Sequence, residues 1–255
     1  MSGTTSDPLN SGLVFSCSPR QGGNSDTAAA LFARTFSVSS GKEVQPLFLR
    51  DFQVLPCIAC DACGRLARRL AADQNREREA RPRAMTVASL SGQGMLPAFG
   101  CALAAKDDSA QLLHSLAVAP NICLVSPVYF YHLPAMLKSL IDRTQPFWSF
   151  REAGLFFAGA ERTCHVILIG ARPKGDQLFT GSLLTLKYAL SGLNVRLADP
   201  LLLYGLEAPS ALASNSEAVE KVRAYAAAAA KGFAVPHAGR GNSNEGKSAP
   251  PETER

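Results

Sequence analysis

Short apolar runs alternate with amphipathic stretches along most of the chain. The apolar runs have the length of β-strands and predict strands at residues 13–17, 44–49, 121–127, 164–169 and 195–203. Apolar residues at helical spacing predict helices over residues 25–36, 107–117, 133–143, 182–190 and 217–231. This alternation predicts an α/β fold with one parallel sheet covered by helices on both faces. Ligands of such sheets bind outside the carboxyl ends of the strands, where the connections reverse direction.

The composition predicts one globular domain over residues 12–235. A chain of 255 residues with 47% hydrophobic and 18% charged residues is long enough to bury a sizeable core. We expect a flexible N-terminus at residues 1–11, and a disordered tail at residues 236–255, which are rich in Gly, Ser, Pro and charge. The start of the chain lacks a signal-peptide pattern, and no apolar stretch approaches the roughly 20 residues that span a bilayer. A cytoplasmic protein with no membrane partner is therefore expected.

The net charge of +5 raises the possibility of a nucleic-acid partner. The arginines concentrate in residues 64–83, where acidic residues also occur. This mixture favours a solvated, charged helix face, so no nucleic-acid partner is expected.

A polar loop, SCSPRQGGNSD, follows the first predicted strand and leads into the first predicted helix. It contains Ser18, Arg20, Asn24 and Ser25, together with glycines that let backbone N–H groups turn inward. Such groups at a helix N-terminus bind phosphate. The loop has neither a G-x-G-x-x-G fingerprint nor a Walker lysine, which disfavours bound NAD or a nucleoside triphosphate. A polar turn with a helix cap is the alternative interpretation.

The third predicted strand runs into the segment SPVYFYHLPAMLKSLIDR. Its residues Pro127, Val128, Tyr129 and Phe130 are expected at the same edge of the sheet as the polar loop. Aromatic walls and backbone hydrogen bonds suit a flat, amphipathic ring system such as isoalloxazine. The alternative is a strand end that carries core aromatics.

Seven cysteines occur in the chain, and three of them, Cys57, Cys60 and Cys63, are separated by two residues each in PCIACDAC. Thiolates at this spacing converge on one metal centre with little loss of chain entropy. Soft thiolates suit an iron-sulfur cluster or zinc, and a cysteine-rich loop without metal is a third alternative. The cysteines in apolar strands, at positions 17, 123 and 164, are expected to be buried packing residues.

The polar loop, the cysteine motif and the aromatic segment together resemble the NADPH-dependent FMN reductases and iron-sulfur flavoproteins. The resemblance extends over residues 12–235 and implies a flavodoxin-like three-layer sandwich with a five-stranded parallel sheet of order 2-1-3-4-5. It implies FMN as cofactor, with the phosphate on the four polar-loop residues and the ring against residues 127–130. The resemblance also implies that the loop after the next strand completes the pocket with Gly170, Ala171 and Arg172.

The same resemblance implies a fourth cysteine just before an Asp-Asp pair. Cys101 precedes Asp107 and Asp108 in this way, although residues 64–100 intervene as an insertion. Closing such a loop costs on the order of 1 to 2 kcal/mol, which leaves a [4Fe-4S] cluster on the four cysteines possible on energetic grounds. The motif and insertion together occupy residues 57–101.

The leading hypothesis from the sequence is an FMN-dependent, NAD(P)H-dependent FMN reductase-like enzyme that passes electrons through FMN and a [4Fe-4S] cluster to an acceptor. One alternative is a cluster-free NAD(P)H:FMN or quinone reductase, and another is a non-enzymatic flavodoxin-like electron carrier or binding scaffold. No catalytic side chain is assigned, because hydride transfer to a flavin needs no protein acid or base. The resemblance further implies a homodimer or larger homo-oligomer, with a small molecule or protein as electron donor and acceptor.

Overall fold

The computed structural model describes residues 12–76, 85–86, 100–155, 157–158 and 161–233 of the chain. The expectations for residues 1–11 and 236–255 lie outside these ranges. Among the residues described, no helix combines the length and apolar character needed to cross a membrane.

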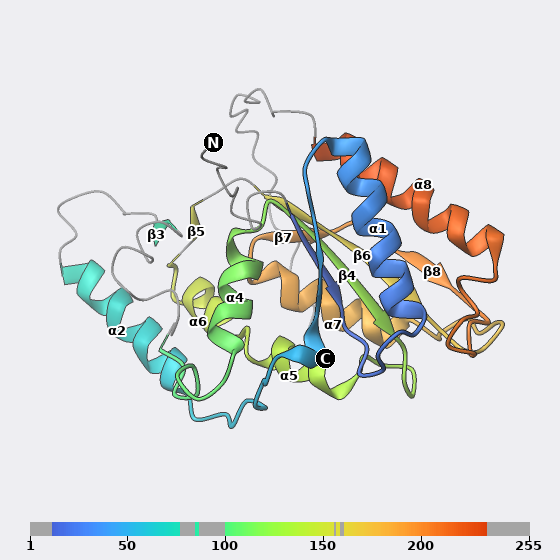
Figure 1. Ribbon diagram of the computed structural model, residues 1–255. Helices are drawn as coiled ribbons and strands as arrows, with labels where there is room; N and C mark the ends of the chain where they lie inside the picture. Colours follow the sequence, from blue (N-terminus) through green and yellow to red (C-terminus); the bar gives the residue numbers. More distant parts are fainter. Residues whose placement is uncertain (1–11, 77–84, 87–99, 156, 159–160, 234–255) are drawn as a thin grey trace, which may run out of the picture.

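A parallel β-sheet forms the centre of the molecule (Figure 1). Its strands are β1 (Leu13–Ser16), β2 (Pro46–Phe48), β4 (Asn121–Pro127), β6 (Arg162–Ile169), β7 (Val195–Leu197) and β8 (Leu201–Leu203). They lie in the order β2-β1-β4-β6, with β7 and β8 both paired to the outer edge of β6. All these pairs are parallel, which confirms the flavodoxin-like order 2-1-3-4-5 predicted for the sheet.

The last predicted strand, residues 195–203, is divided in two. β7 pairs with the first half of β6, and β8 pairs with its second half. Ala198 still donates its N–H to the carbonyl of Cys164, at 2.9 Å. Pro200 stands directly before β8 and has no N–H to donate, so the interruption falls where the ladder cannot continue.

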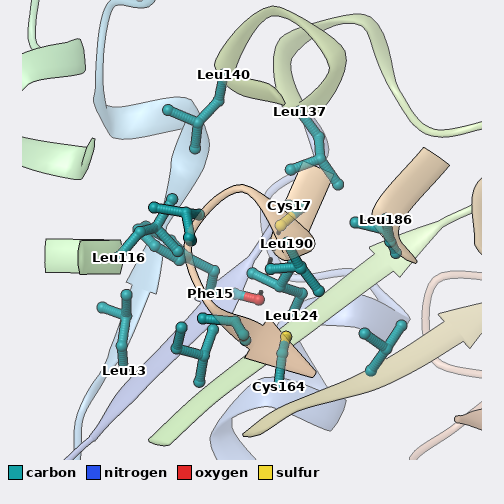
Figure 2. Packing of buried hydrophobic residues seen from close by; sticks show 14 of the residues in the cluster. Leu13, Phe15, Cys17, Leu116, Leu124, Leu137, Leu140, Cys164, Leu186 and Leu190 are labelled. Carbon is teal, nitrogen blue, oxygen red and sulfur yellow. Dashed lines mark hydrogen bonds between the residues drawn. The ribbon is translucent and has the colours of Figure 1, made fainter. Parts of the chain in front are cut away.

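Two layers of helices cover the sheet (Figure 1). The helices are α1 (Asn24–Ser40), α4 (Ser109–Val118), α5 (Ala135–Asp142), α6 (Gln145–Glu152), α7 (Thr180–Ser191) and α8 (Ser216–Phe233). In β1, Leu13 and Phe15 pack into the core formed with α4 to α7, whereas Val14 packs into the core formed with α1 and α8. Figure 2 shows the first of these cores, with leucines of α4, α5 and α7 around Phe15. The period-two alternation of a strand thus gives the predicted three layers.

Further elements that sequence patterns did not define occur in the region of the predicted insertion and after α5. Helix α2 (Ala62–Arg76) packs on α6 through Ala67, Phe150 and Leu155. The strands β3 (Met85–Thr86) and β5 (Phe157–Ala158) form a separate parallel pair. Helix α6 was not predicted, although its Pro146 in the first turn is a common helix-start signal.

A buried ion pair joins the start of α4 to the end of α5. Arg143 Nη1 lies 2.6 Å from Asp107 Oδ2, and both side chains are almost completely buried. Arg143 also donates to Ser109 Oγ at 2.6 Å and to the carbonyl of Leu55 at 3.0 Å, while the Leu55 N–H donates to Asp107 at 2.7 Å. Burial acts to raise the pKa of Asp107, but the hydrogen bonds from Ser109, Arg143 and Leu55 outweigh it and lower the pKa below the ordinary carboxyl value.

Replacing Arg143 with Met is expected to lower the free energy of unfolding by about 3 to 5 kcal/mol, because it leaves the Asp107 carboxylate buried without its partner. Urea denaturation measures the change. Glu220→Gln is the control, since Glu220 pairs with Arg223 on the exposed face of α8 and its loss should cost less than about 1 kcal/mol. Similar small losses for both variants would contradict a central role for the buried pair.

The contribution of Asp107 to stability should depend on pH. Because its folded-state pKa is lowered, its stabilisation is present at neutral pH and is lost as the pH falls below about 4. Asp107→Asn removes this titration. The difference in unfolding free energy between wild type and Asp107→Asn should therefore be largest near pH 7 and should shrink towards pH 3, whereas a constant difference would refute the assignment.

Candidate functional site

Three loops meet at the carboxyl edge of the sheet, because the strands before them run in parallel. The Cys17 N–H, just after β1, donates to the carbonyl of Val125 in β4, at 2.8 Å. The Val128 N–H, just after β4, donates to the carbonyl of Ile169 in β6, at 2.9 Å. The polar loop, the aromatic segment and the loop at 170–172 therefore lie side by side, as the sequence predicted (Figure 1).

The polar loop leads directly into the first turn of α1. This turn begins at Asn24, and helix geometry provides no internal acceptors for the backbone N–H groups of a first turn. The side chains of Ser18 and Ser25 are buried beside it, whereas Arg20 is exposed. The Ser18 hydroxyl accepts the N–H of Arg20 at 3.1 Å and donates to the Arg20 carbonyl at 3.2 Å, and Gly22 adopts a positive φ of 68°. The helix start thus offers backbone N–H groups without internal acceptors beside two serines and an exposed arginine, which suits an anion.

Asn24 has a different role from the predicted one. Its Nδ2 donates to the carbonyls of Leu206 and Ala208, at 3.1 and 2.8 Å, and its Oδ1 accepts the N–H of Leu212 at 2.9 Å. The side-chain amide therefore fastens the segment after β8 to the start of α1 and has no hydrogen left to donate to a phosphate. The assignment of Asn24 to the phosphate site stays a prediction, and in this structure the Asn24 side chain serves the fold.

An acidic residue that the sequence analysis did not single out lies inside the polar loop. Asp26 accepts the hydroxyl of Ser16 and Arg50 Nη1 at Oδ1, the latter at 2.9 Å, and the N–H of Gly22 at Oδ2, at 2.7 Å. Arg50 belongs to the short 3₁₀ helix η2 (Leu49–Asp51), and its guanidinium carbon lies 4.4 Å from the centre of the Phe48 ring. An acidic residue in a first helical turn was the only sequence signal, since Arg50 arrives through the pairing of β2 with β1.

The aromatic segment forms a tight turn after β4. Tyr129 and His132 exchange two backbone hydrogen bonds, at 2.9 and 3.0 Å, and the residues between them, Phe130 and Tyr131, have positive φ angles of 50° and 63°. Positive φ at both central positions is typical of a type I′ turn, which usually carries Asn and Gly. Phe130 is fully exposed and Tyr129 is 41% exposed, so the alternative of core aromatics is wrong for these two rings. Val128, by contrast, packs partly against the core.

The third loop is joined to this turn. Arg172 Nη1 lies 2.9 Å from the Tyr131 hydroxyl, and the guanidinium carbon lies 5.4 Å from the centre of the Tyr131 ring. On the other side of the turn, His132 Nε2 is 3.1 Å from the Thr185 hydroxyl of α7. The predicted residues at 127–130 and 170–172 are therefore brought together, with a cation at the rim.

The cysteines of the motif are only partly brought together. Cys57 and Cys60 are exposed, while Cys63 and Cys101 are half-buried. Burial raises the pKa of the Cys63 thiol, and the nearby thiol of Cys101 adds to this rise. Gly100, with a φ of 68°, packs so closely on α2 that an added Cβ would lie 2.6 Å from Leu66 Cδ2, one helical turn from Cys63.

Cys101 thus lies near Cys63, although the predicted insertion separates them in the sequence. Within the described ranges, however, no group of three or more His, Cys, Asp or Glu side chains is arranged to hold a metal ion. The residues present do not form the predicted four-thiolate site. The three strand cysteines are buried as predicted, and burial raises the pKa of Cys17 to about 12.

Comparison with known proteins agrees with this geometry. The NADPH-dependent FMN reductase family matches residues 63–183. This span contains the aromatic turn and the loop at 170–172, and it begins after the polar loop. No curated protein matches the chain.

Several solved structures share the fold. A flavone reductase is 12% identical with a TM-score of 0.51, and the match covers 87% of this chain but only 63% of that protein. RosB with a bound 8-demethyl-8-formylriboflavin-5′-phosphate is 11% identical with a TM-score of 0.50, over 87% of this chain and 79% of RosB. The azoreductase AzrA is 13% identical with a TM-score of 0.50, over 87% of this chain and 99% of AzrA. The family match over residues 63–183 and the shared fold confirm the resemblance found in the sequence, and the chain has a flavodoxin-like fold.

Proposed function

We propose that this chain is an FMN-dependent oxidoreductase that takes electrons from NAD(P)H and delivers them to an acceptor. One observation carries the proposal: β1 and β4 are adjacent parallel strands, so an anion-binding helix start and an exposed aromatic turn lie beside each other at one edge. FMN has a phosphate at one end and a flat ring system at the other, and these two features suit its two ends.

The phosphate end of the site would be the first turn of α1, with Ser18, Arg20 and Ser25. The N–H groups of the helix start and the positive end of its dipole favour a phosphate, and Arg20 adds a charge-assisted hydrogen bond from the solvent side. The side chain of Asn24 is left out because its amide is already bonded to the segment after β8.

The ring end of the site would lie against Pro127 to Phe130 and against the loop from Gly170 to Arg172. Arg172 donates a hydrogen bond to the Tyr131 hydroxyl and so joins these two loops, which supports a ring site whose two walls are in place before a ligand binds. When bound, FMN supplies the redox chemistry, accepting a hydride and releasing electrons. The protein's own task is therefore to bind and orient the ring and to leave one face open to donor and acceptor.

Two comparisons support the proposal: the family match covers the ring end of the site, and one protein of the same fold binds a flavin phosphate. The family match includes the residues of the aromatic turn and of the 170–172 loop. RosB, which has the same fold, binds a derivative of riboflavin 5′-phosphate. We propose that this chain likewise binds a flavin phosphate and acts as a reductase. We also propose that it acts as a homo-oligomer, as the sequence resemblance implies.

A [4Fe-4S] cluster is not part of the proposed electron path. The cluster needs four converging thiolates, and the structure brings together only Cys63 and Cys101. This observation favours the alternative of a cluster-free NAD(P)H:FMN or quinone reductase over a cluster-containing flavoprotein.

The phosphate site can be tested with Arg20→Gln. Losing a charge-assisted hydrogen bond should raise the Kd for FMN about tenfold or more, while the Kd for riboflavin, which lacks the phosphate, should stay the same. Fluorescence quenching titrations measure both constants. Arg34→Gln is the matched control, because Arg34 lies on the exposed side of α1 and the change in net charge is the same. The proposal fails if the wild-type chain does not bind FMN at micromolar concentrations or does not oxidise NAD(P)H with an added acceptor.

The role of the cysteines can be tested with the double variant Cys57→Ser/Cys60→Ser. Both thiols are exposed, so FMN affinity and NAD(P)H oxidation should stay within about twofold of wild type. Iron and acid-labile sulfide are measured in anaerobically purified protein alongside. Iron and sulfide in the wild type that disappear in the variant, together with a loss of electron transfer, would restore the cluster to the path.

A further inference from the structure

The proposed phosphate site contains a feature that works against phosphate binding. Asp26 is in the first turn of α1 and is only 9% exposed, so its carboxylate stands in the same loop that would receive a dianion. Like charges in a poorly solvated loop repel each other. An anion site that retains such a group needs both a counter-charge and a reason for the carboxylate.

Arg50 supplies the counter-charge. Its Nη1 lies 2.9 Å from Asp26 Oδ1, and the side chain is only 16% exposed. The guanidinium stacks on Phe48, which pairs in register with Ser16 at the end of β1. The 3₁₀ helix that carries Arg50 therefore begins beside the polar loop, and the arginine is held from the sheet side of the site.

The carboxylate also connects the parts of the loop. Asp26 Oδ2 accepts the N–H of Gly22 at 2.7 Å, and Gly22 has the positive φ of 68° that turns the chain into α1. Asp26 Oδ1 accepts the hydroxyl of Ser16, which is completely buried at the strand end. One side chain thus ties together the end of β1, the turn, the helix start and Arg50.

We propose that Asp26 and Arg50 form a positioning pair for the phosphate end of the site, an inference that rests on the proposed function. Asp26 sets the shape of the turn so that the backbone N–H groups of the helix start converge on the phosphate. Arg50 holds the carboxylate and cancels its charge. Both residues act through the loop and not by contact with the phosphate.

The test compares FMN with riboflavin, because a positioning role at the phosphate end affects only the former. Asp26→Asn should raise the Kd for FMN about tenfold or more and leave the Kd for riboflavin within about twofold. Simple electrostatics gives the opposite sign, since removal of a negative charge would tighten phosphate binding. Arg50→Gln should raise the Kd for FMN to a similar extent. The Kd of the double variant should not exceed the higher of the two single-variant values, because the two residues act as a unit.

Two further variants keep the test decisive. Glu43→Gln is the control, since Glu43 is exposed, lies outside the polar loop and loses the same charge. Arg50→Lys keeps a positive charge beside Asp26, so it should retain most of the preference for FMN over riboflavin. This variant replaces Arg50→Gln in the comparison if Arg50→Gln does not fold. Thermal unfolding of each variant without ligand verifies that it is folded.

The outcomes separate the inference from the proposed function. Tighter FMN binding in Asp26→Asn, or equal losses for FMN and riboflavin, would overturn the positioning pair. If wild type prefers FMN to riboflavin and the Asp26 and Arg50 variants keep that preference, the inference alone fails. If wild type binds neither flavin, the proposed function fails, and the pair with it.

Discussion

Parallel hydrogen bonding between β1, β4 and β6 is the constraint on which the candidate site depends. Ser16 pairs with Val125, and Pro127 pairs with Ile169, so the three strands end within a few residues of one another. Every polar or aromatic residue that follows these strands therefore comes to one edge of the sheet. The hydrogen bonds between the strands therefore place the three loops beside one another, and the side chains of the loops then form the candidate site.

Two buried or nearly buried carboxylate–guanidinium pairs hold the surroundings of this edge, and they differ in what they join. Arg143 and Asp107 connect the start of α4, the end of α5 and the segment at Leu55, and both side chains are almost completely buried. Asp26 and Arg50 connect the polar loop to the sheet and are partly open to solvent. The first pair is an architectural link, because all of its partners are structural groups. The second lies in the proposed phosphate site, so we expect its geometry to affect ligand binding as well as folding.

The cysteine motif is only partly assembled in the region where the sequence predicts an insertion. Helix α2 packs on α6, and Gly100 lies close against Leu66, so the chain returns to the N-terminal part of α2. Cys101 is thereby brought to Cys63, although 37 residues separate them in the sequence. Cys57 and Cys60 lie before α2 and are exposed, whereas Cys63 lies inside that helix and is half-buried.

The sequence by itself determined the layered α/β architecture, the strand positions and the meeting of the polar loop with the aromatic segment. These follow from periodic burial and from the rule that parallel strands place their exits at one edge, and both are local properties of the chain. Only the tertiary structure decided that the Asn24 amide bonds to carbonyls 182 and 184 residues away, that Arg50 reaches Asp26, and that Phe130 and Tyr131 form a turn with positive φ. The pattern of apolar and polar residues records which side chains are buried, but the partner of a polar group is set by what lies beside it in space, which no local pattern contains.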